Sequence, residues 1–290
     1  MLLQEFIQHL RVERGLSPCT SSSYGYQIRA YMRFLGARGI PLPTVAREAI
    51  LDYLEAKTDA KLAGSSIFAA AIAIRQFHRF LAERGHMETD PTNGLSLPKF
   101  KQRLPEPLSV QDMGSLLDAP IGPKFHQIRN RAMLELMYAT GMRVSELLSL
   151  TLPVINLEAC QVRICGKGDK ERVIPFGQKA KNAVLSYLAA RTQRFPVAPA
   201  TLFLTHKGQS INRGTFWWEL KRMARKAGLQ GRITPHQIRH SAATHMLEGG
   251  ADIRVLQEFM GHSLITTTQR YAHVSPKLLK NTCNKAHPRF

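Results

Sequence analysis

Two side chains in the last quarter of the chain have the types and the spacing to hold an anion. His236 and Arg239 follow Thr234 and Pro235, which are typical of the cap and the first position of a helix. Side chains three residues apart share a helix face, and the free N–H groups of a first turn favour negative charge. With Gln237 completing a predicted capping box, the segment favours a phosphate clamp, although H-x-x-R alone also fits a surface histidine beside a solvated arginine.

Further residues that suit phosphate chemistry lie on both sides of this segment along the chain. Arg143 follows a glycine break, His262 follows a predicted helix that Gly261 ends, and Tyr271 comes a little later. Each has a structural alternative: Arg143 as a partner for Glu146, His262 as a loop residue, and Tyr271 as a half-buried packing residue. Their order and spacing taken together are much harder to obtain by chance.

The second half of the chain resembles the catalytic domain of the tyrosine recombinases, or integrase family, and within it the bacterial Xer chromosome-dimer resolvases. The resemblance covers residues 136–289 and rests on the stretches LMYATGMRVSELLSL, GKGDKERVIPFG, TPHQIRHSAATHM, GGADIRVLQEFMGHS, TTTQRYAHVS and the terminal HPR. Leu264, where Asp is frequent, and Ala242, where a bulkier residue is frequent, depart from the pattern. The first half matches the family's helical core-binding domain more loosely.

The resemblance implies an enzyme that cuts and rejoins DNA at specific sites through a 3′-phosphotyrosine, with Xer-type chromosome or plasmid dimer resolution as its role. Glu146 fits the family's supporting acidic position. The implied catalytic set is Arg143, Lys167, His236, Arg239, His262 and the nucleophile Tyr271.

The residue types suit this chemistry. The planar forks of Arg143 and Arg239 match the equatorial oxygens of a phosphodiester under attack. Tyr271, with a reference pKa of about 10, needs a base, for which His236 is the best candidate, while His262 would hydrogen-bond a phosphoryl oxygen. Lys167, in a glycine-flanked hairpin loop, could deliver the proton that the departing 5′ oxygen needs.

No cofactor is expected, because the covalent link conserves the phosphodiester energy. The sequence has no Walker loop and no carboxylate cluster for two magnesium ions. His236 and His240 have the spacing of a zinc motif, but Gln237 stands where its glutamate would be, so we predict no metal site.

Composition also points to nucleic acid. Among 290 residues, 40 Lys and Arg stand against 21 Asp and Glu, which gives a net charge of +19. A surface this basic favours a polyanion. Four scattered cysteines, the lack of a long apolar run and the lack of a signal layout favour a cytoplasmic protein without membrane insertion. The resemblance implies a bacterial protein associated with the nucleoid.

We expect two domains of mainly α structure. Residues 1–97 form a predicted all-helical, SAM-like core-binding domain and residues 98–107, with three prolines, a linker. Residues 108–290 form a predicted mixed α/β catalytic domain, predominantly helical with a small antiparallel sheet. Both halves are basic, with 14 Lys and Arg against nine acids up to residue 103 and 26 against 12 beyond it. The alternative is that only one domain binds DNA.

Local patterns predict the individual elements. Ser17-Pro18 begins one helix, and an apolar stripe that ends before Gly85 predicts a second. Strands are predicted at Gln161–Cys165 and Glu171–Pro175, around the hairpin loop. Helices are predicted at residues 128–139 and 144–150 and from residue 216 onward. The candidate DNA-binding residues outside the catalytic set are Arg75, Arg79, Lys101, Arg103 and Lys170, although Arg75 and Arg79 also fit a solvated helix face.

The resemblance further implies partners. Duplex DNA with a specific core site is the substrate, and a homotetramer, or a heterotetramer with a related recombinase, would act on paired sites. The resemblance also implies an FtsK-type DNA translocase as a regulator. The acid-free tail 276–290 would dock onto a neighbouring protomer, with a frayed tail as the alternative.

Three alternative functions remain: a phage or mobile-element integrase, a type IB topoisomerase, and a DNA-binding module that no longer cleaves. The length, the lack of an arm domain and the HPR ending favour the Xer group.

Overall fold

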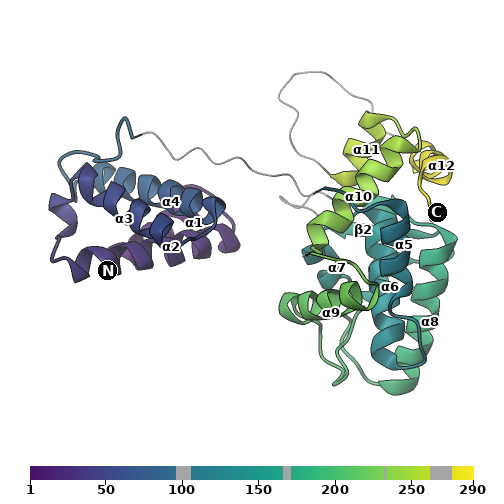
Figure 1. Cartoon of the computed structure of the whole chain (residues 1–290). Helices are drawn as coiled ribbons and strands as arrows, with labels where there is room; N and C mark the ends of the chain where they lie inside the picture. The colour runs from purple at the N-terminus through teal and green to yellow at the C-terminus, as the bar shows by residue number, and fades with distance from the viewer. Residues whose placement is uncertain (96–105, 166–170, 232, 262–275) are drawn as a thin grey trace. The chain divides into compact units, whose positions relative to one another are not determined.

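A computed structural model describes the chain except for residues 96–105, 166–170, 232 and 262–275. It divides the chain into two compact units, residues 1–104 and 105–290 (Figure 1). In the described part, no helix is long and apolar enough to cross a membrane. The predicted linker 98–107 lies almost wholly outside the described residues.

The N-terminal unit is a helical bundle, and the predicted cap begins its second helix. Ser17 begins α2 by accepting a hydrogen bond from the Thr20 amide at 3.2 Å. The predicted apolar stripe of α4 is buried: α2 and α4 pack on each other, and a buried hydrogen bond of 3.0 Å joins Tyr31 to His78 between them. Its helices are α1 (Leu2–Val12), α2 (Pro18–Ala37), the short η1 (Leu42–Thr44), α3 (Arg47–Asp59) and α4 (Gly64–Glu83).

The catalytic unit is built around the buried helix α6, which lies alongside α8 and also contacts α5 and α10 (Figure 1). Its elements are α5 (Val110–Asp118), α6 (Phe125–Thr140), α7 (Val144–Ser149), η2 (Leu152–Val154), β1 (Ile155–Asn156), β2 (Gln161–Cys165), β3 (Glu171–Pro175), α8 (Gln178–Arg194), α9 (Arg213–Lys226), α10 (Pro235–Glu248), α11 (Ile253–Met260) and α12 (Pro276–Ala286).

The sheet and the helix ends confirm the predicted fold class. The three strands are antiparallel in the order β1-β2-β3, and β2 pairs with β3 from Gln161 opposite Pro175 to Cys165 opposite Glu171. Both predicted strands have the predicted bounds. Gly261 ends α11 in the left-handed conformation, with φ +63°, as its position predicted.

One predicted local motif is wrong. Thr234 caps α10, because its side chain accepts the Gln237 amide at 3.0 Å. The side chain of Gln237, however, does not return to Thr234 to complete a capping box; its amide donates to the carbonyl of Glu106 at 2.8 Å. This bond fastens the start of the catalytic unit to α10, a long-range use that the local sequence pattern does not reveal.

The C-terminal segment packs onto its own catalytic unit instead of fraying. Helix α12 contacts β3, α10 and α11, and Cys283 is completely buried. Beyond the helix, Arg289 forms ion pairs of 3.2 Å with Asp118 and with the buried Glu135. A side-chain carbon at Gly177 would lie 2.2 Å from the main chain of Phe290, so this position has no room for one.

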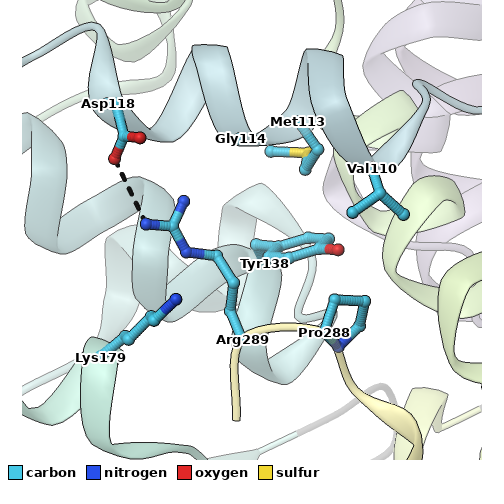
Figure 2. A pocket seen from close by; sticks show the side chains of 8 residues that line it. All are labelled: Val110, Met113, Gly114, Asp118, Tyr138, Lys179, Pro288 and Arg289. Carbon is cyan, nitrogen blue, oxygen red and sulfur yellow. Dashed lines mark hydrogen bonds and ion pairs between the residues drawn. The ribbon is translucent and has the colours of Figure 1, made fainter.

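A small cavity of about 250 Å³ borders this docking site. Figure 2 shows Arg289 reaching Asp118 on α5; Tyr138 on α6 and Lys179 on α8 also line the cavity. His287 contacts Tyr138 on helix α6. The centres of the two rings are 4.7 Å apart, and Nε2 of His287 lies 3.2 Å from the Tyr138 carbonyl oxygen. The last four residues are therefore held by ionic, aromatic and backbone contacts together.

Docking of this segment is expected to weaken in acid. Burial lowers the pKa of His287 to about 4, so the folded state holds the ring neutral where an unfolded chain would protonate it. A depressed histidine pKa contributes stability above pH ~6.5 that is lost as pH falls toward 4, here on the order of 3 kcal/mol. Hydrogen exchange of amides 279–290, corrected for intrinsic rates, should show less protection at pH 5 than at pH 7.5.

The His287→Gln variant is the control, since its side chain is neutral at both pH values. Glu135, whose pKa is raised by burial, titrates in both proteins and therefore cancels in the comparison. Equal pH dependence in the variant and the parent would contradict the role given to His287.

Candidate active site

The carboxylate of Glu146 organises the candidate site. It lies in α7, is almost completely buried, and accepts hydrogen bonds from two arginines. Arg143 donates its backbone N–H to Oε2 at 2.7 Å and its Nη1 to Oε1 at 3.0 Å. Arg172, on β3, donates Nη1 to Oε1 at 3.1 Å and Nη2 to Oε2 at 2.9 Å, a two-pronged pair.

The chain reaches this position through a sharp turn. Gly141 ends α6 in the left-handed conformation, with φ +57°, and Arg143 then caps α7. A side-chain carbon at Gly141 would lie 2.8 Å from the sulfur of Met260, so the turn also packs tightly on the end of α11. The guanidinium of Arg143, with 45% of its side chain exposed, stays at the surface of the site.

Arg239 lies on α10 in the same cluster, and it is buried. Its Nη1 donates to the Gly141 carbonyl at 2.6 Å and its Nη2 to the Met260 carbonyl at 2.5 Å. These are carbonyls at the C-terminal ends of α6 and α11, where helix dipoles favour a cation. Burial, followed by repulsion from Arg143, lowers the pKa of Arg239 to about 10, so the guanidinium remains charged at neutral pH.

Of the predicted catalytic residues, the structure brings Arg143, Arg239 and the supporting Glu146 together. His236 is exposed in the first turn of α10, the turn that also holds Arg239. Lys167, His262 and Tyr271 lie outside the described residues, as do the candidate DNA-binding residues Lys101, Arg103 and Lys170.

The residue before His262 is described, and it belongs to the cluster. The Gly261 carbonyl oxygen lies 3.4 Å from Nη2 of Arg143. The last described residue after α11 therefore lies directly beside the first arginine.

The two candidate DNA-binding arginines of the N-terminal unit differ in their surroundings. Arg75 is partly buried, and its guanidinium donates to the carbonyl of Leu95. Arg79 is exposed, and among the described residues it forms a long ion pair of 3.6 Å with Glu83, one helical turn away. Of the two, Arg79 is the better placed to contact a phosphate.

Arg172 is a site residue that the sequence analysis missed. It shares the inward face of β3 with the buried Ile174, where an apolar residue is the usual choice. A charged side chain in that position requires a buried partner of opposite sign. The alternation of β3 was therefore a usable signal, but its partner Glu146 is remote in sequence.

Comparisons with known proteins show which family the chain belongs to. Residues 107–277 match the phage integrase family, and residues 3–85 match the phage integrase N-terminal SAM-like domain. The chain belongs to the phage integrase family of tyrosine recombinases. It is 43% identical to a tyrosine recombinase XerD of Halalkalibacterium halodurans, over 99% of this chain and 97% of that protein. A XerD of Staphylococcus aureus is 37% identical over 99% of both chains.

Solved structures share the fold at lower identity. A XerH site-specific recombinase bound to a palindromic difH substrate has a TM-score of 0.72 at 21% identity, over 90% of this chain and 77% of that one. A lambda integrase dimer bound to a COC′ core site has a TM-score of 0.72 at 19% identity, over 94% and 98%. The prediction of a tyrosine recombinase of the Xer type, active in site-specific recombination, is confirmed.

Removing the shared carboxylate is expected to destabilise the catalytic unit. Glu146→Ala leaves two guanidiniums close together without their acceptor, which should lower the free energy of unfolding by about 3 kcal/mol. Urea unfolding followed by tryptophan fluorescence measures this, because both tryptophans, Trp217 and Trp218, lie in the catalytic unit.

Glu171→Ala, on β3 next to Arg172, provides the matched control. Its carboxylate is exposed and 3.9 Å from Arg163, so its loss should cost less than about 1 kcal/mol. Similar losses for the two variants would contradict the central position of Glu146.

Proposed function

We propose that this chain cuts and rejoins duplex DNA at a specific site through a covalent link between Tyr271 and the 3′ phosphate. The observation that supports it most directly is the charge of the described cluster. The carboxylate of Glu146 lies among three arginines, Arg143, Arg172 and Arg239. Three positive charges and one negative charge leave the cluster with a net charge of +2. A partly dehydrated site of this kind favours a phosphate whose negative charge grows during attack.

In the proposed reaction, Arg143 and Arg239 hold the non-bridging oxygens of the phosphate. The Tyr271 oxygen attacks phosphorus while His236 accepts the phenolic proton, and the bond from phosphorus to the 5′ oxygen breaks. Lys167 protonates that oxygen, and His262 donates a hydrogen bond to the phosphoryl group. One phosphate ester replaces another, so the scheme draws on neither ATP nor a metal, and the reverse attack by a 5′ hydroxyl rejoins the strand.

The proposed role is Xer-type resolution of chromosome or plasmid dimers in the bacterial cytoplasm, at the nucleoid. It is supported by the XerD relatives over nearly the full chain. We propose that residues 1–97 and 108–290 contact the DNA from two domains joined by residues 98–107. Two protomers on each of two sites would form a tetramer of this chain alone or with a related recombinase, as a lambda integrase forms on a Holliday junction, under the control of an FtsK-type translocase.

The covalent step can be tested with a nicked suicide duplex in EDTA. The duplex carries the protein's own binding site, obtained by selecting bound sequences from a random library. Wild-type protein should form an adduct that survives denaturation, and Tyr271→Phe should bind the duplex without forming one. An adduct of normal yield in the phenylalanine variant would show that another residue is the nucleophile.

The role of the Arg143 fork is tested by Arg143→Lys, which keeps the charge and removes the planar pair of donors. The rate of adduct formation at saturating protein should fall about 10²- to 10³-fold, the usual effect of losing one preorganised donor. DNA affinity should change only a few-fold. Arg163→Lys, at an exposed position on β2, is the control and should cleave at the parental rate.

A further inference from the structure

Arg172 has a more specific position than a simple salt-bridge partner would need. It is the second residue of β3, opposite Ile164 on β2, and only 15% of its side chain is exposed. Its guanidinium lies directly against Gly261: a side-chain carbon there would be 2.9 Å from Cζ and 3.0 Å from Nε and Nη1. Arg172 thus joins β3, Glu146 of α7 and the end of α11.

This position lets Arg172 compete with Arg143 for one acceptor. A carboxylate has about four lone-pair sites, and four N–H groups occupy those of Glu146: two from the Arg172 fork, and the backbone N–H and Nη1 of Arg143. Arg143 therefore gives Glu146 only one side-chain donor. Without Arg172, Glu146 would be open to a two-pronged pair with Arg143, which would turn the fork of Arg143 away from a phosphate.

We propose that Arg172 is a positioning residue for the cleavage step: by occupying Glu146 with its own fork, it keeps the fork of Arg143 available to the phosphate. The inference rests on the proposed function, because it assumes that Arg143 contacts the phosphate.

The charge state of Glu146 agrees with this arrangement. Burial by itself raises the pKa of this carboxyl, but hydrogen bonds from Arg172 and Arg143 outweigh burial and hold the pKa below its ordinary value. The carboxylate is therefore ionised at neutral pH and available to both arginines. The Nε of Arg172 is buried and has no hydrogen-bond partner among the described residues, so only its outer fork takes part in these contacts.

The first test compares Arg172→Gln and Arg172→Lys with the control Arg163→Gln, an exposed arginine one strand away. Adduct formation at saturating protein should slow on the order of 10- to 100-fold in Arg172→Gln, the range for losing a group that orients an active-site ligand. The lysine variant, which restores charge without the fork, should recover only part of the rate. Because Arg172→Gln also removes a partner of the buried Glu146, rates and DNA affinity are compared at a temperature well below the unfolding of every variant; DNA affinity should stay within a few-fold of the control, and a parental cleavage rate in Arg172→Gln would overturn the proposal.

A double-mutant cycle separates positioning from a merely structural role. Once Glu146→Gln has weakened the shared acceptor, the further change Arg172→Gln should slow cleavage less than three-fold, because both residues act through one contact. Full additivity of the two rate effects would mean that Arg172 acts by another route, and would overturn the proposal.

A substrate with sulfur in place of the bridging 5′ oxygen tests whether Arg172 acts instead on protonation of the leaving group. A thiolate leaves without needing a proton, so this substrate should restore the rate of Lys167→Ala, whose defect is the missing acid. The defect of Arg172→Gln should persist, because the fork of Arg143 is needed with either leaving group. If the sulfur substrate restored the rate of Arg172→Gln, Arg172 would act through Lys167, and the inference would be contradicted.

These outcomes distinguish the inference from the function on which it rests. If the wild-type protein forms no covalent adduct with any selected duplex, the proposed function itself fails. If the wild type forms the adduct and Arg172→Gln forms it equally fast, only the inference about Arg172 fails.

Discussion

The site depends on one carboxylate, Glu146, that forms ion pairs with two arginines at once. Glu146 neutralises a single positive charge, yet it contacts both Arg143 and Arg172, and Arg239 lies beside them. With fewer positive charges the site would have little to offer a phosphate, and with no carboxylate the arginines would repel one another. One acid among three guanidiniums holds the cluster together and still leaves it cationic.

Backbone carbonyls stabilise the third arginine of the cluster, Arg239. Arg239 is buried without a carboxylate of its own, and two peptide carbonyls accept its hydrogen bonds. Those carbonyls are available because α6 and α11 end next to each other, each at a glycine in the left-handed conformation. The partial negative charge of two helix ends offsets part of the cost of burying a cation. Glycine suits both breaks because the backbone there is left-handed and a side-chain carbon would have no room.

How far the sequence could predict this structure depends on the range of the interaction. The caps at Ser17 and Thr234, the glycine end of α11 and both strands of the hairpin were predictable, because each is decided by residues close together in the chain. The family resemblance supplied Arg143 and Arg239 as a set. The catalytic roles of all the predicted site residues stay predictions, and Lys167, His262 and Tyr271 lie outside the described residues.

What the sequence did not predict involves partners that are remote along the chain. The side chain of Gln237 bonds Glu106 instead of its own helix cap, and Arg75 bonds the carbonyl of Leu95. Arg172 belongs to the same class, because its partner Glu146 is on another element. Local propensity does not predict such pairs, and the one sequence signal for any of them was the inward position of Arg172 on a strand, which requires a partner of opposite charge.

The C-terminal segment connects these observations, because it packs on the elements that hold the site. Helix α12 contacts β3, which carries Arg172, and α10, which carries Arg239. Its buried Leu279 and Cys283 contribute hydrophobic stabilisation, about 1.5–3 kcal/mol for a fully buried leucine. The segment can therefore leave its place only where another surface covers the same apolar residues, and its departure would remove packing from the strand and helix behind the arginines. Its docking is thus part of the support of the cationic cluster.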